Sequence, residues 1–362
     1  MKKICLAFNH FQHQDGVSRS ALAIANALAE KGLAEITLVP IYTDEKAFRK
    51  LLNPHVKVNH VFGFYFHGMS KIVNKIPLSW INRFAIKDDY DIMIGFQESL
   101  PIKCIAASHR SSHASKFAWM HCYFDWLLPM LRQDYETIGT VICVSRCNAE
   151  RLHKELPSIK VDYNYNPIDD VQVRKFGEEP IDIQRPEGLL FVTVGRLSPE
   201  KGFGRLLDIM KRLKEEGEKF HLWIIGDGPI EAKLKHQCLD LGLQEEVLFL
   251  GRQPNPHKYT SKADVFVCSS FIEGYSTACT EAIMLNVPVV TTSVSGAEEI
   301  IEEAGCGKMA GMDDDSLYTV LKEVCEKPAM VKDWKAILQE TKGRFSAEVR
   351  IRRLINLFQL ND

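Results

Sequence analysis

The chain has 362 residues, of which 46% are hydrophobic and 25% charged, and its formal net charge is −2. This composition excludes a disordered chain, a collagen-like repeat and a generally basic nucleic-acid-binding protein. Because single domains usually have about 100–200 residues, the length predicts two α/β domains.

Charge is distributed unevenly along the chain. Residues 1–166 carry 20 Lys and Arg against 15 Asp and Glu, which gives them a net charge of +5. Residues 167–362 carry 25 Lys and Arg against 32 Asp and Glu, which gives them a net charge of −7. A basic half indicates contact with something anionic.

The ten cysteines form no CxxC pair, which is typical of a reducing compartment. The sequence shows no signal-peptide core and no long apolar window, so we expect a cytoplasmic protein, soluble or peripheral at the inner membrane face.

Apolar strands alternate with helical patterns from one end of the chain to the other. Residues 2–10 predict a first strand, and Val17 to Lys31 predict a helix that ends at Gly32. Four short apolar runs follow, as expected for parallel strands that are buried on both faces: AEITLVPIY, DIMIGF, KFAWMH and TVICVS. Residues 171–188 are charged and contain two prolines, which indicates a linker or domain edge.

The pattern then restarts with five further strand-like runs: LLFVTVG, HLWIIG, VLFLG, DVFVCSS and VPVVTTS. It predicts a second parallel sheet, wound like the first. Ligands of open α/β sheets bind outside the carboxyl ends of the strands, so we expect the site at those ends, in a cleft between two facing domains.

Two glutamates accompany a predicted helix start within residues 264–281. A strand ends at Ser269, a loop carries Glu273 and Gly274, and a helix begins near Ser276 and contains Glu281. The N–H groups and dipole of a helix N-terminus suit a diphosphate. Carboxylates repel a diphosphate, so these two are expected to accept hydrogen bonds from a sugar and a ribose. The alternative is an ordinary strand–loop–helix with two exposed glutamates.

Two cations follow the first strand of the second half. Arg196 comes directly after the strand and Lys201 five residues later, before Gly202. An Arg fork and a Lys point charge together neutralise a diphosphate. The alternative is a pair of solvated surface cations.

These motifs are similar to those of the retaining glycosyltransferases of family 4 (glycosyl transferases group 1). The matching segments are GRLSPEKG, GDGP at residues 226–229, and EGYSTACTE with seven residues between its glutamates. The resemblance implies the GT-B architecture of two Rossmann-like domains. We expect an acceptor-side domain over 1–168, a nucleotide-sugar-binding domain over 169–345, and a helix over 346–362 that packs back on the first domain.

The resemblance also implies roles for individual residues. Arg196 and Lys201 would bind the diphosphate, Glu273 the hydroxyls of the donor sugar and Glu281 those of the ribose. Arg252, in GRQPN, would contact the base. The backbone that lines the sugar and phosphate would be that of Gly274, Tyr275, Ser276 and Thr277.

In the first domain the match is looser. The family often has two glycines after the first strand, whereas this chain has Asp15-Gly16, so only Gly16 matches. His121 ends a strand where the family commonly has a histidine near the reacting face of the sugar; the alternative is a histidine with a purely structural role. Ser145 in VSRCNAERL is expected to cap a helix.

Two acidic motifs resemble metal sites. Asp89-Tyr90-Asp91 spells DxD but directly precedes the strand DIMIGF, at the amino end of the sheet, where a solvated turn is expected. Asp313-Asp314-Asp315 precedes a helix, where acidic residues suit the dipole. We expect no metal and no cofactor besides the nucleotide-sugar co-substrate.

Residues 62–87 combine aromatic side chains with four basic residues and contain no acidic residue. Such a segment either docks on an anionic membrane or forms core-facing helices with a solvated basic side.

The predicted function, implied by the resemblance, is metal-independent hexosyl transfer (EC 2.4) with retention of anomeric configuration. The donor would be a nucleotide sugar, with UDP expected from its frequency in the family. The acceptor would be a glycan or a lipid-linked glycan in polysaccharide, lipopolysaccharide or capsule assembly. Two alternatives remain: an inactive nucleotide-sugar-binding partner subunit, and a GT-B nucleotide-sugar epimerase.

Overall fold

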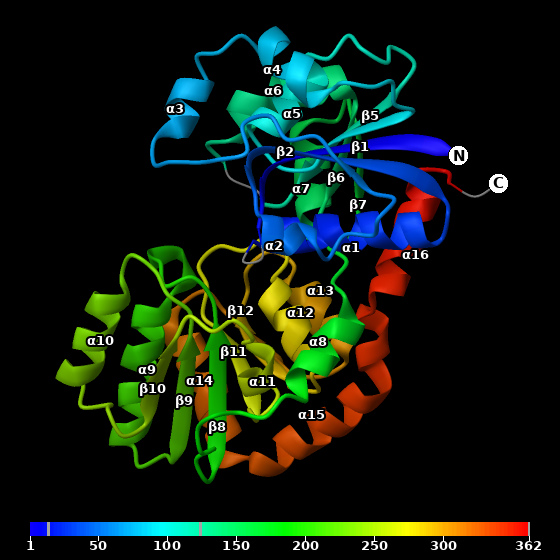
Figure 1. Cartoon of the computed structure of the whole chain (residues 1–362). Helices are drawn as coiled ribbons and strands as arrows, with labels where there is room; N and C mark the ends of the chain where they lie inside the picture. The colour runs from blue at the N-terminus through cyan, green and yellow to red at the C-terminus, as the bar shows by residue number, and fades with distance from the viewer. Residues whose placement is uncertain (13–14, 123–124, 361–362) are drawn as a thin grey trace. The chain divides into compact units, whose positions relative to one another are not determined.

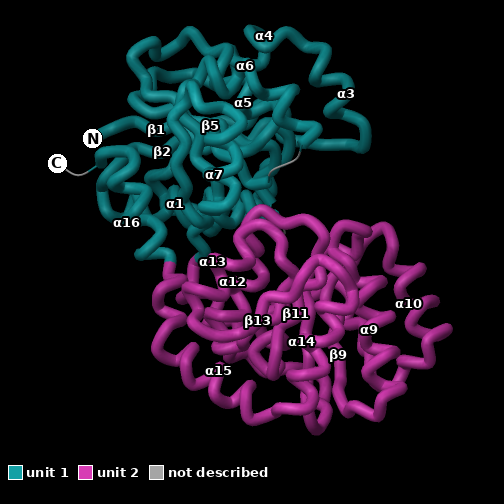
Figure 2. The backbone as a smooth tube through the Cα atoms, turned by 180° about the vertical axis from the view of Figure 1, so that it is seen from behind, with its two compact units in different colours: residues 1–168, 347–362 teal, residues 169–346 magenta. Residues whose placement is uncertain are grey.

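The computed structural model describes residues 1–12, 15–122 and 125–360 of the chain. It divides into two compact units, coloured separately in Figure 2. Unit 1 comprises residues 1–168 and 347–362, and unit 2 comprises residues 169–346. The chain therefore leaves unit 1 once and returns to it for its last helix.

Unit 1 contains a seven-stranded parallel sheet in the order β3-β2-β1-β4-β5-β6-β7. Its strands are β1 (Lys2–Phe11), β2 (Ala34–Asp44), β3 (Lys57–Val58), β4 (Ile92–Gly95), β5 (Ser115–Met120), β6 (Thr140–Cys143) and β7 (Lys160–Tyr163). Its helices are α1 (Gly16–Glu30), α2 (Lys46–Arg49), α3 (Met69–Val73), α4 (Leu78–Ala85), α5 (Leu100–Ala106), α6 (Leu128–Ile138), α7 (Arg146–Glu155) and α16 (Ala347–Leu357).

Unit 2 contains a six-stranded parallel sheet in the order β10-β9-β8-β11-β12-β13. Its strands are β8 (Leu189–Val194), β9 (Phe220–Ile225), β10 (Val247–Gly251), β11 (Val265–Cys268), β12 (Val289–Thr292) and β13 (Lys308–Ala310). Its helices are α8 (Asp170–Gly177), η1 (Pro199–Lys201), α9 (Phe203–Glu215), α10 (Glu231–Asp240), α11 (His257–Thr260), α12 (Thr277–Met284), α13 (Ala297–Ala304), α14 (Asp314–Glu326), α15 (Pro328–Thr341) and η2 (Lys342–Phe345).

The strands form where the sequence predicts them because their side chains are apolar on both faces. All four residues of β4 and of β11 are buried, as expected of central strands that are covered on both sides. Figure 1 shows strands running between helices in each unit. The expectation of two Rossmann-like parallel-sheet domains is therefore confirmed.

One local expectation was correct only in part, because residues 171–188 lie near the edge of unit 2, which begins at Asp169. Residues 171–188 do not form a linker throughout, because the segment begins inside helix α8. The Asp169 side chain caps α8 by accepting from Gln172 N at 2.9 Å, and Val173 is buried. The two prolines, at positions 180 and 186, come only after the helix has ended.

The last helix completes unit 1. Helix α16 packs against α1, and the two lie side by side in Figure 1. Arg353 on α16 binds the Asp162 carboxylate at 2.8 Å and donates to the Tyr163 carbonyl oxygen at 2.8 Å, both on β7. Among the helices within residues 1–12, 15–122 and 125–360, none has the length and apolar character needed to cross a bilayer.

Candidate functional site

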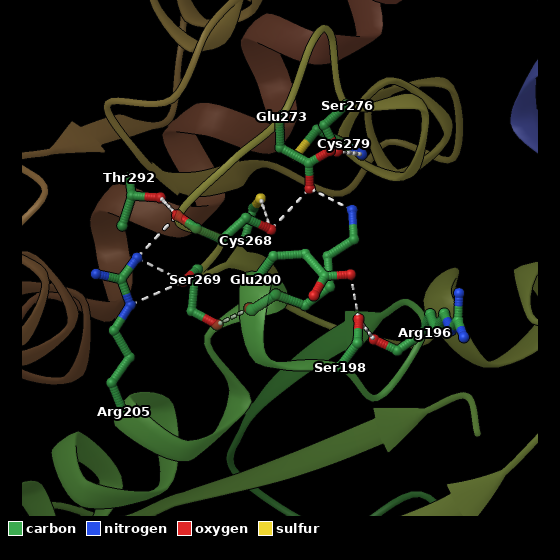
Figure 3. Close-up of polar contacts among 12 residues, drawn as sticks. Arg196, Ser198, Glu200, Arg205, Cys268, Ser269, Glu273, Ser276, Cys279 and Thr292 are labelled. Carbon is green, nitrogen blue, oxygen red and sulfur yellow. Dashed lines mark hydrogen bonds and ion pairs between the residues drawn. The ribbon is translucent and has the colours of Figure 1, made fainter. Parts of the chain in front are cut away.

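The strand order of unit 2 brings two loops to one edge of its sheet. β8 and β11 are neighbours in the sheet although they are not consecutive in the chain. Ligands of doubly wound sheets bind at the carboxyl ends of the strands, at such a switch point. The loop after β8 carries Arg196 and Lys201, and the loop after β11 carries Glu273. Figure 3 labels Arg196 and Glu273.

Glycines allow the backbones of these loops to approach closely. Gly202 has φ +67°, and a Cβ atom there would lie 2.0 Å from the Ser269 carbonyl oxygen. A Cβ atom on Gly226, at φ +140°, would lie 1.9 Å from the Gly195 carbonyl oxygen. Side chains at either position would force the backbones apart, so Gly202 of GRLSPEKG and Gly226 of GDGP are needed for packing in this unit.

Lys201 and Glu273 form an ion pair across the two loops. Lys201 Nζ lies 2.7 Å from Glu273 Oε1, and the same oxygen accepts from Ser270 Oγ at 2.7 Å (Figure 3). Burial opposes the charged form of Lys201, but the adjacent Glu273 carboxylate outweighs it and raises the pKa of the lysine above its ordinary value. Lys201 is therefore a fixed positive charge at neutral pH.

Arg205 on α9 holds the loop that carries Glu273, a role that the sequence did not predict. Its Nε and Nη2 atoms donate to the Ser269 carbonyl oxygen at 2.8 and 2.5 Å, and Nη2 also donates to Ser270 O at 2.8 Å. Nη1 donates to Met312 O at 2.7 Å, and the guanidinium carbon lies 3.9 Å from the centroid of the Phe271 ring. The Arg205 side chain is only 4% exposed, and its charge faces these carbonyl groups and the Asp314 carboxylate, whose Oδ1 lies 3.7 Å from Nη1.

Helix α12 begins directly after this loop. The helix begins near Ser276, as expected from the sequence; Ser276 is its N-cap, and the Ser276 hydroxyl accepts from Cys279 N at 3.4 Å. Gly274 and Tyr275 are buried, and Thr277 is partly buried. A Cβ atom on Gly296, at φ +76°, would lie 2.8 Å from the Tyr275 ring and 3.1 Å from the Gly274 carbonyl oxygen. A third loop, after β12, therefore packs against residues 274–275.

Glu281 lies on α12 beside a buried histidine. His257 Nε2 is 3.3 Å from Glu281 Oε2, and the two side chains are 9% and 7% exposed. His257 begins α11, two residues after the last residue of the GRQPN segment, and its ring stacks on Phe176 of α8 at a centroid distance of 6.1 Å. The predicted ribose-binding carboxylate thus lies where α8, α11 and α12 pack together.

The two predicted arginine contacts are exposed. The Arg196 side chain follows β8 and extends away from the other labelled side chains in Figure 3. Arg252 Nη1 lies 3.8 Å from Asp227 Oδ2, and both side chains are more than half exposed. Both guanidinium groups are accessible to an anionic ligand.

In unit 1, Asp15 caps the helix that begins at Gly16. The Asp15 carboxylate accepts from Ser18 N at 3.1 Å and from Val17 N at 3.4 Å. The Ser18 hydroxyl donates to the His10 carbonyl oxygen at 2.6 Å. The residue that departs from the family pattern therefore stabilises the start of α1.

His121 follows β5 and is held through both ring nitrogens. Nε2 lies 2.9 Å from the Phe96 carbonyl oxygen, so this nitrogen carries the proton, and Nδ1 lies 3.4 Å from Asn166 Nδ2. Burial lowers the pKa of His121 to about 4. The imidazole is therefore neutral at neutral pH and is oriented by neighbouring groups.

Glu98 joins the loops after β4 and β5. Its Oε1 atom accepts from His121 N at 2.5 Å and from Cys122 N at 2.7 Å. Burial raises the pKa of Glu98 to about 7, although these backbone hydrogen bonds favour the charged form. The next residue, Ser99, has φ +77° and ψ −128°, a strained conformation for a residue other than glycine.

The two acidic motifs have structural roles. Asp89 accepts from Ser111 Oγ at 3.1 Å, and Asp91 accepts from Lys3 N at 2.7 Å, both before β4 begins. Asp313 caps α14 by accepting from Ser316 N at 2.8 Å. Within residues 1–12, 15–122 and 125–360, no cluster of three or more His, Cys, Asp or Glu side chains is placed to hold a metal ion.

The structure thus places the predicted residues in two groups. Unit 2 holds Arg196, Lys201, Arg252, residues 273–277 and Glu281, and unit 1 holds Gly16 and His121. Arg205, His257 and Glu98 were not predicted, because their partners lie 64, 24 and 23 residues away along the chain. The only sequence signal for them is their place beside a strand end or a motif.

Residues 178–339 match the model of the family described as "Glycosyl transferases group 1". The chain is 25% identical over 359 residues to the lipopolysaccharide core biosynthesis glycosyltransferase LpsD of Rhizobium meliloti, with 96% of each chain covered. It is 26% identical over 308 residues to a Campylobacter jejuni enzyme, with 83% of this chain and 82% of the enzyme covered. The latter is named GalNAc-alpha-(1->4)-GalNAc-alpha-(1->3)-diNAcBac-PP-undecaprenol alpha-1,4-N-acetyl-D-galactosaminyltransferase.

Among solved structures, that of Anabaena HepE in complex with UDP and glucose has a TM-score of 0.74 and 16% sequence identity. The match covers 99% of this chain and 100% of the HepE chain, and it shows that the fold is shared. Together, the family match over residues 178–339 and the fold of both units support a glycosyltransferase with the two Rossmann-like domains of the GT-B architecture.

Proposed function

We propose that the protein is a family 4 glycosyltransferase that transfers a hexosyl group from a UDP-sugar to a glycan or lipid-linked acceptor, with retention of anomeric configuration. The observation that carries this proposal is the Lys201–Glu273 pair at the switch point of unit 2, beside the N-terminus of α12. The cation and the helix start at this sheet edge suit a diphosphate, and the carboxylate suits the hydroxyl groups of a sugar.

Each group has a chemical role in this proposal. An ammonium group has three N–H donors, and Lys201 uses one on Glu273, which leaves the others for phosphate oxygens. The exposed Arg196 guanidinium and the N-terminal dipole of α12 add positive potential where charge builds on the leaving diphosphate. Glu273 Oε1 is occupied by Lys201 and Ser270, so Oε2 would accept from a sugar hydroxyl.

His121 would orient the donor sugar rather than transfer a proton. A ring with a pKa of about 4 is a weak base at neutral pH, and its Nε2–H is engaged with Phe96 O. In the proposed mechanism, which follows the family resemblance, the departing diphosphate accepts the proton of the acceptor hydroxyl. No metal or other cofactor takes part.

The substrate classes are supported by the similar proteins. HepE was solved with UDP and glucose, which supports a UDP-sugar donor. The Campylobacter jejuni relative is named for an undecaprenol-diphosphate-linked glycan, and LpsD for lipopolysaccharide core biosynthesis. We therefore propose assembly of a surface polysaccharide or lipopolysaccharide as the process that the enzyme serves.

The first test is binding of UDP, GDP and ADP, measured by thermal shift and calorimetry with and without EDTA. A ligand at ~100 times its Kd adds about 2.7 kcal/mol to the free energy of unfolding. We expect one nucleotide to stabilise the protein to the same extent in EDTA. Lys201→Ala should weaken its binding about 10- to 100-fold, because a hydrogen bond to a charged group contributes about 1.5–3 kcal/mol.

The matched control is Lys211→Ala on α9, since that lysine pairs with Glu215 on the surface. This variant should bind the nucleotide as tightly as wild type does. Equal affinity in Lys201→Ala and wild type would contradict the assignment of the diphosphate site. Incubation with UDP-sugars and undecaprenol-diphosphate-linked or lipopolysaccharide acceptors then tests transfer, and NMR of the product anomer tests retention. An epimer formed from the donor alone would instead indicate an epimerase.

We also propose that residues 62–87 dock on an anionic membrane. Met69, Val73 and Ile81 anchor α3 and α4 in an apolar cluster of unit 1. Large apolar side chains of the same segment remain 39–57% exposed, namely Phe64, Tyr65, Phe66, Ile72, Trp80 and Phe84. Lys71, Lys75, Arg83 and Lys87 belong to the same stretch, which contains no acidic residue. Aromatic and basic side chains together suit an anionic lipid surface.

Vesicle flotation tests this docking. We expect binding to vesicles that contain phosphatidylglycerol but little binding to phosphatidylcholine alone. Replacing Lys71 and Lys75 by Ala should weaken binding about five-fold per residue, since each basic residue near the surface contributes about 1 kcal/mol. Lys211→Ala serves again as the control, and equal binding to both kinds of vesicle would contradict the electrostatic part of the proposal.

A further inference from the structure

His257 is a buried polar side chain whose hydrogen-bonding groups are poorly satisfied. The residue is 7% exposed, and neither ring nitrogen makes a hydrogen bond of good geometry to another described residue. The Glu281 carboxylate nevertheless lies at hydrogen-bonding distance, 3.3 Å from Nε2. Buried polar groups without partners are rare in folded proteins, and each calls for an explanation in the function or the packing of the site.

The backbone around His257 is fixed on several sides. Asn255 Oδ1 accepts from His257 N at 3.0 Å, and Asn255 Nδ2 donates to Phe176 O at 2.9 Å. Ser261 Oγ, just after α11, donates to the Gly177 carbonyl oxygen at 2.7 Å. These bonds join α11 to α8, and the imidazole is held between the Phe176 ring and α12.

Helix α8 also packs directly against α12. A Cβ atom on Gly177 would lie 2.3 Å from Leu285 Cδ2, so the end of α8 touches the residue that follows α12. The position of α12, and with it that of Glu281, is therefore set from the α8 and α11 side. His257 is the side chain of α11 that reaches the Glu281 carboxylate.

We infer that His257 is a positioning residue that orients the Glu281 carboxylate toward the ribose of the donor nucleotide. This inference rests on the proposed function, in which Glu281 accepts from ribose hydroxyls. A small rotation of either side chain would turn the 3.3 Å contact into a hydrogen bond from Nε2–H to Oε2, which would fix the orientation of the carboxylate. His257 would in this way set how well the site distinguishes a ribonucleotide from a 2′-deoxyribonucleotide.

The experiment compares two ligands on four forms of the full chain. The diphosphate among UDP, GDP and ADP that binds wild type most tightly is titrated by calorimetry, and so is its 2′-deoxy form. The variants are His257→Phe, which keeps a ring but removes the N–H group, His257→Gln, which restores an N–H donor, and His236→Phe. His236 on α10 is the matched control, because its imidazole also pairs with a carboxylate, Asp240 at 2.8 Å, on the exposed surface.

Wild type and His236→Phe should prefer the ribonucleotide by about 10- to 100-fold, the range for a hydrogen bond to a charged group. His257→Phe should reduce this preference to within about three-fold while the 2′-deoxy form binds as in wild type, and His257→Gln should restore it. If His257 had a purely structural role, His257→Phe would bind both ligands more weakly by the same factor, and the ratio of the two affinities would stay as in wild type.

A folded His257→Phe variant with the wild-type ratio would overturn the inference and leave the proposed function intact. If this variant does not fold, His257→Leu takes its place with the same criterion. Absence of binding of all three diphosphates to wild type would overturn the proposed function, and the inference with it.

Discussion

Replacing Arg205 by Met should destabilise unit 2 more than any other single loss of charge on α9. Met keeps an apolar stem as far as the position of Nε but removes the guanidinium group, and with it every hydrogen bond of that group and its contact with the Phe271 ring. The Ser269, Ser270 and Met312 carbonyl oxygens then lose their bonds from a side chain that is 4% exposed. Removing one partner of a buried charged network costs about 3–5 kcal/mol, which we take as the expected loss.

Arg212→Met is the matched control on the same helix. Arg212 pairs with Asp315 at 2.7 Å and lies over the Tyr318 ring at 3.9 Å, but its side chain is 42% exposed. Exposed pairs contribute about 0–1 kcal/mol, so this variant should be nearly as stable as wild type.

The assay is urea unfolding of both variants, followed by circular dichroism, with the two units allowed separate transitions. Arg205→Met should lower the transition of unit 2 and should also weaken nucleotide binding, because Glu273 is carried by the loop that Arg205 holds. If Arg205→Met and Arg212→Met agree within about 1 kcal/mol, the network does not stabilise the loop and the reasoning is refuted.

Two further predictions follow from backbone packing and from burial. Gly202→Ala should lower the free energy of unfolding by several kcal/mol and weaken nucleotide binding, since its Cβ would meet the Ser269 carbonyl oxygen at 2.0 Å. The control is Gly217→Ala, which has φ +89° and no atom within 4 Å of its Cβ, so it should lower that free energy by only about 1–2 kcal/mol. Equal losses of stability in thermal unfolding would contradict the packing argument. The lowered pKa of His121, about 4, removes stability as the pH falls from 6.5 toward 4, because only the unfolded chain then binds the proton. The raised pKa of Glu98, about 7, acts in the opposite direction between pH 4.5 and 7. Glu98→Gln should therefore lose about 1.5 kcal/mol more than wild type between pH 6.5 and pH 5 in urea unfolding, and parallel losses in both proteins would refute the opposed titrations.

Local patterns predicted the fold because they sufficed to identify the strands. Short apolar runs such as the VFVC of DVFVCSS are typical of strands that are covered on both faces. The same reasoning missed the helix at residues 170–177, where charge and nearby prolines concealed a helix with one buried large apolar side chain, Val173, and one partly buried, Phe176. Helix α8 depends on tertiary packing against α11 and α12, which no local pattern encodes.

For the candidate site, too, local motifs identified individual residues but not the contacts between them. Lys201 and Glu273 were named from motifs, but their direct ion pair is a contact between loops 72 residues apart. Glu98 was not considered, because a glutamate after a strand has no distinguishing pattern until the His121 and Cys122 amides are seen to converge on it. Sequence motifs identify the groups that would face a ligand, and only the structure identifies those that hold them.

The return of the chain to unit 1 for α16 has a consequence for biosynthesis. During translation, residues 169–346 are complete before residues 347–362 emerge, so unit 2 can fold while unit 1 still lacks a helix. Until then Asp162 has no Arg353, and the surface of α1 that α16 covers stays open to solvent. Domains generally fold as units, so unit 1, whose synthesis begins first, should complete its folding after unit 2. Fragments that end near residue 168 should aggregate, whereas residues 169–346 should be expressible alone.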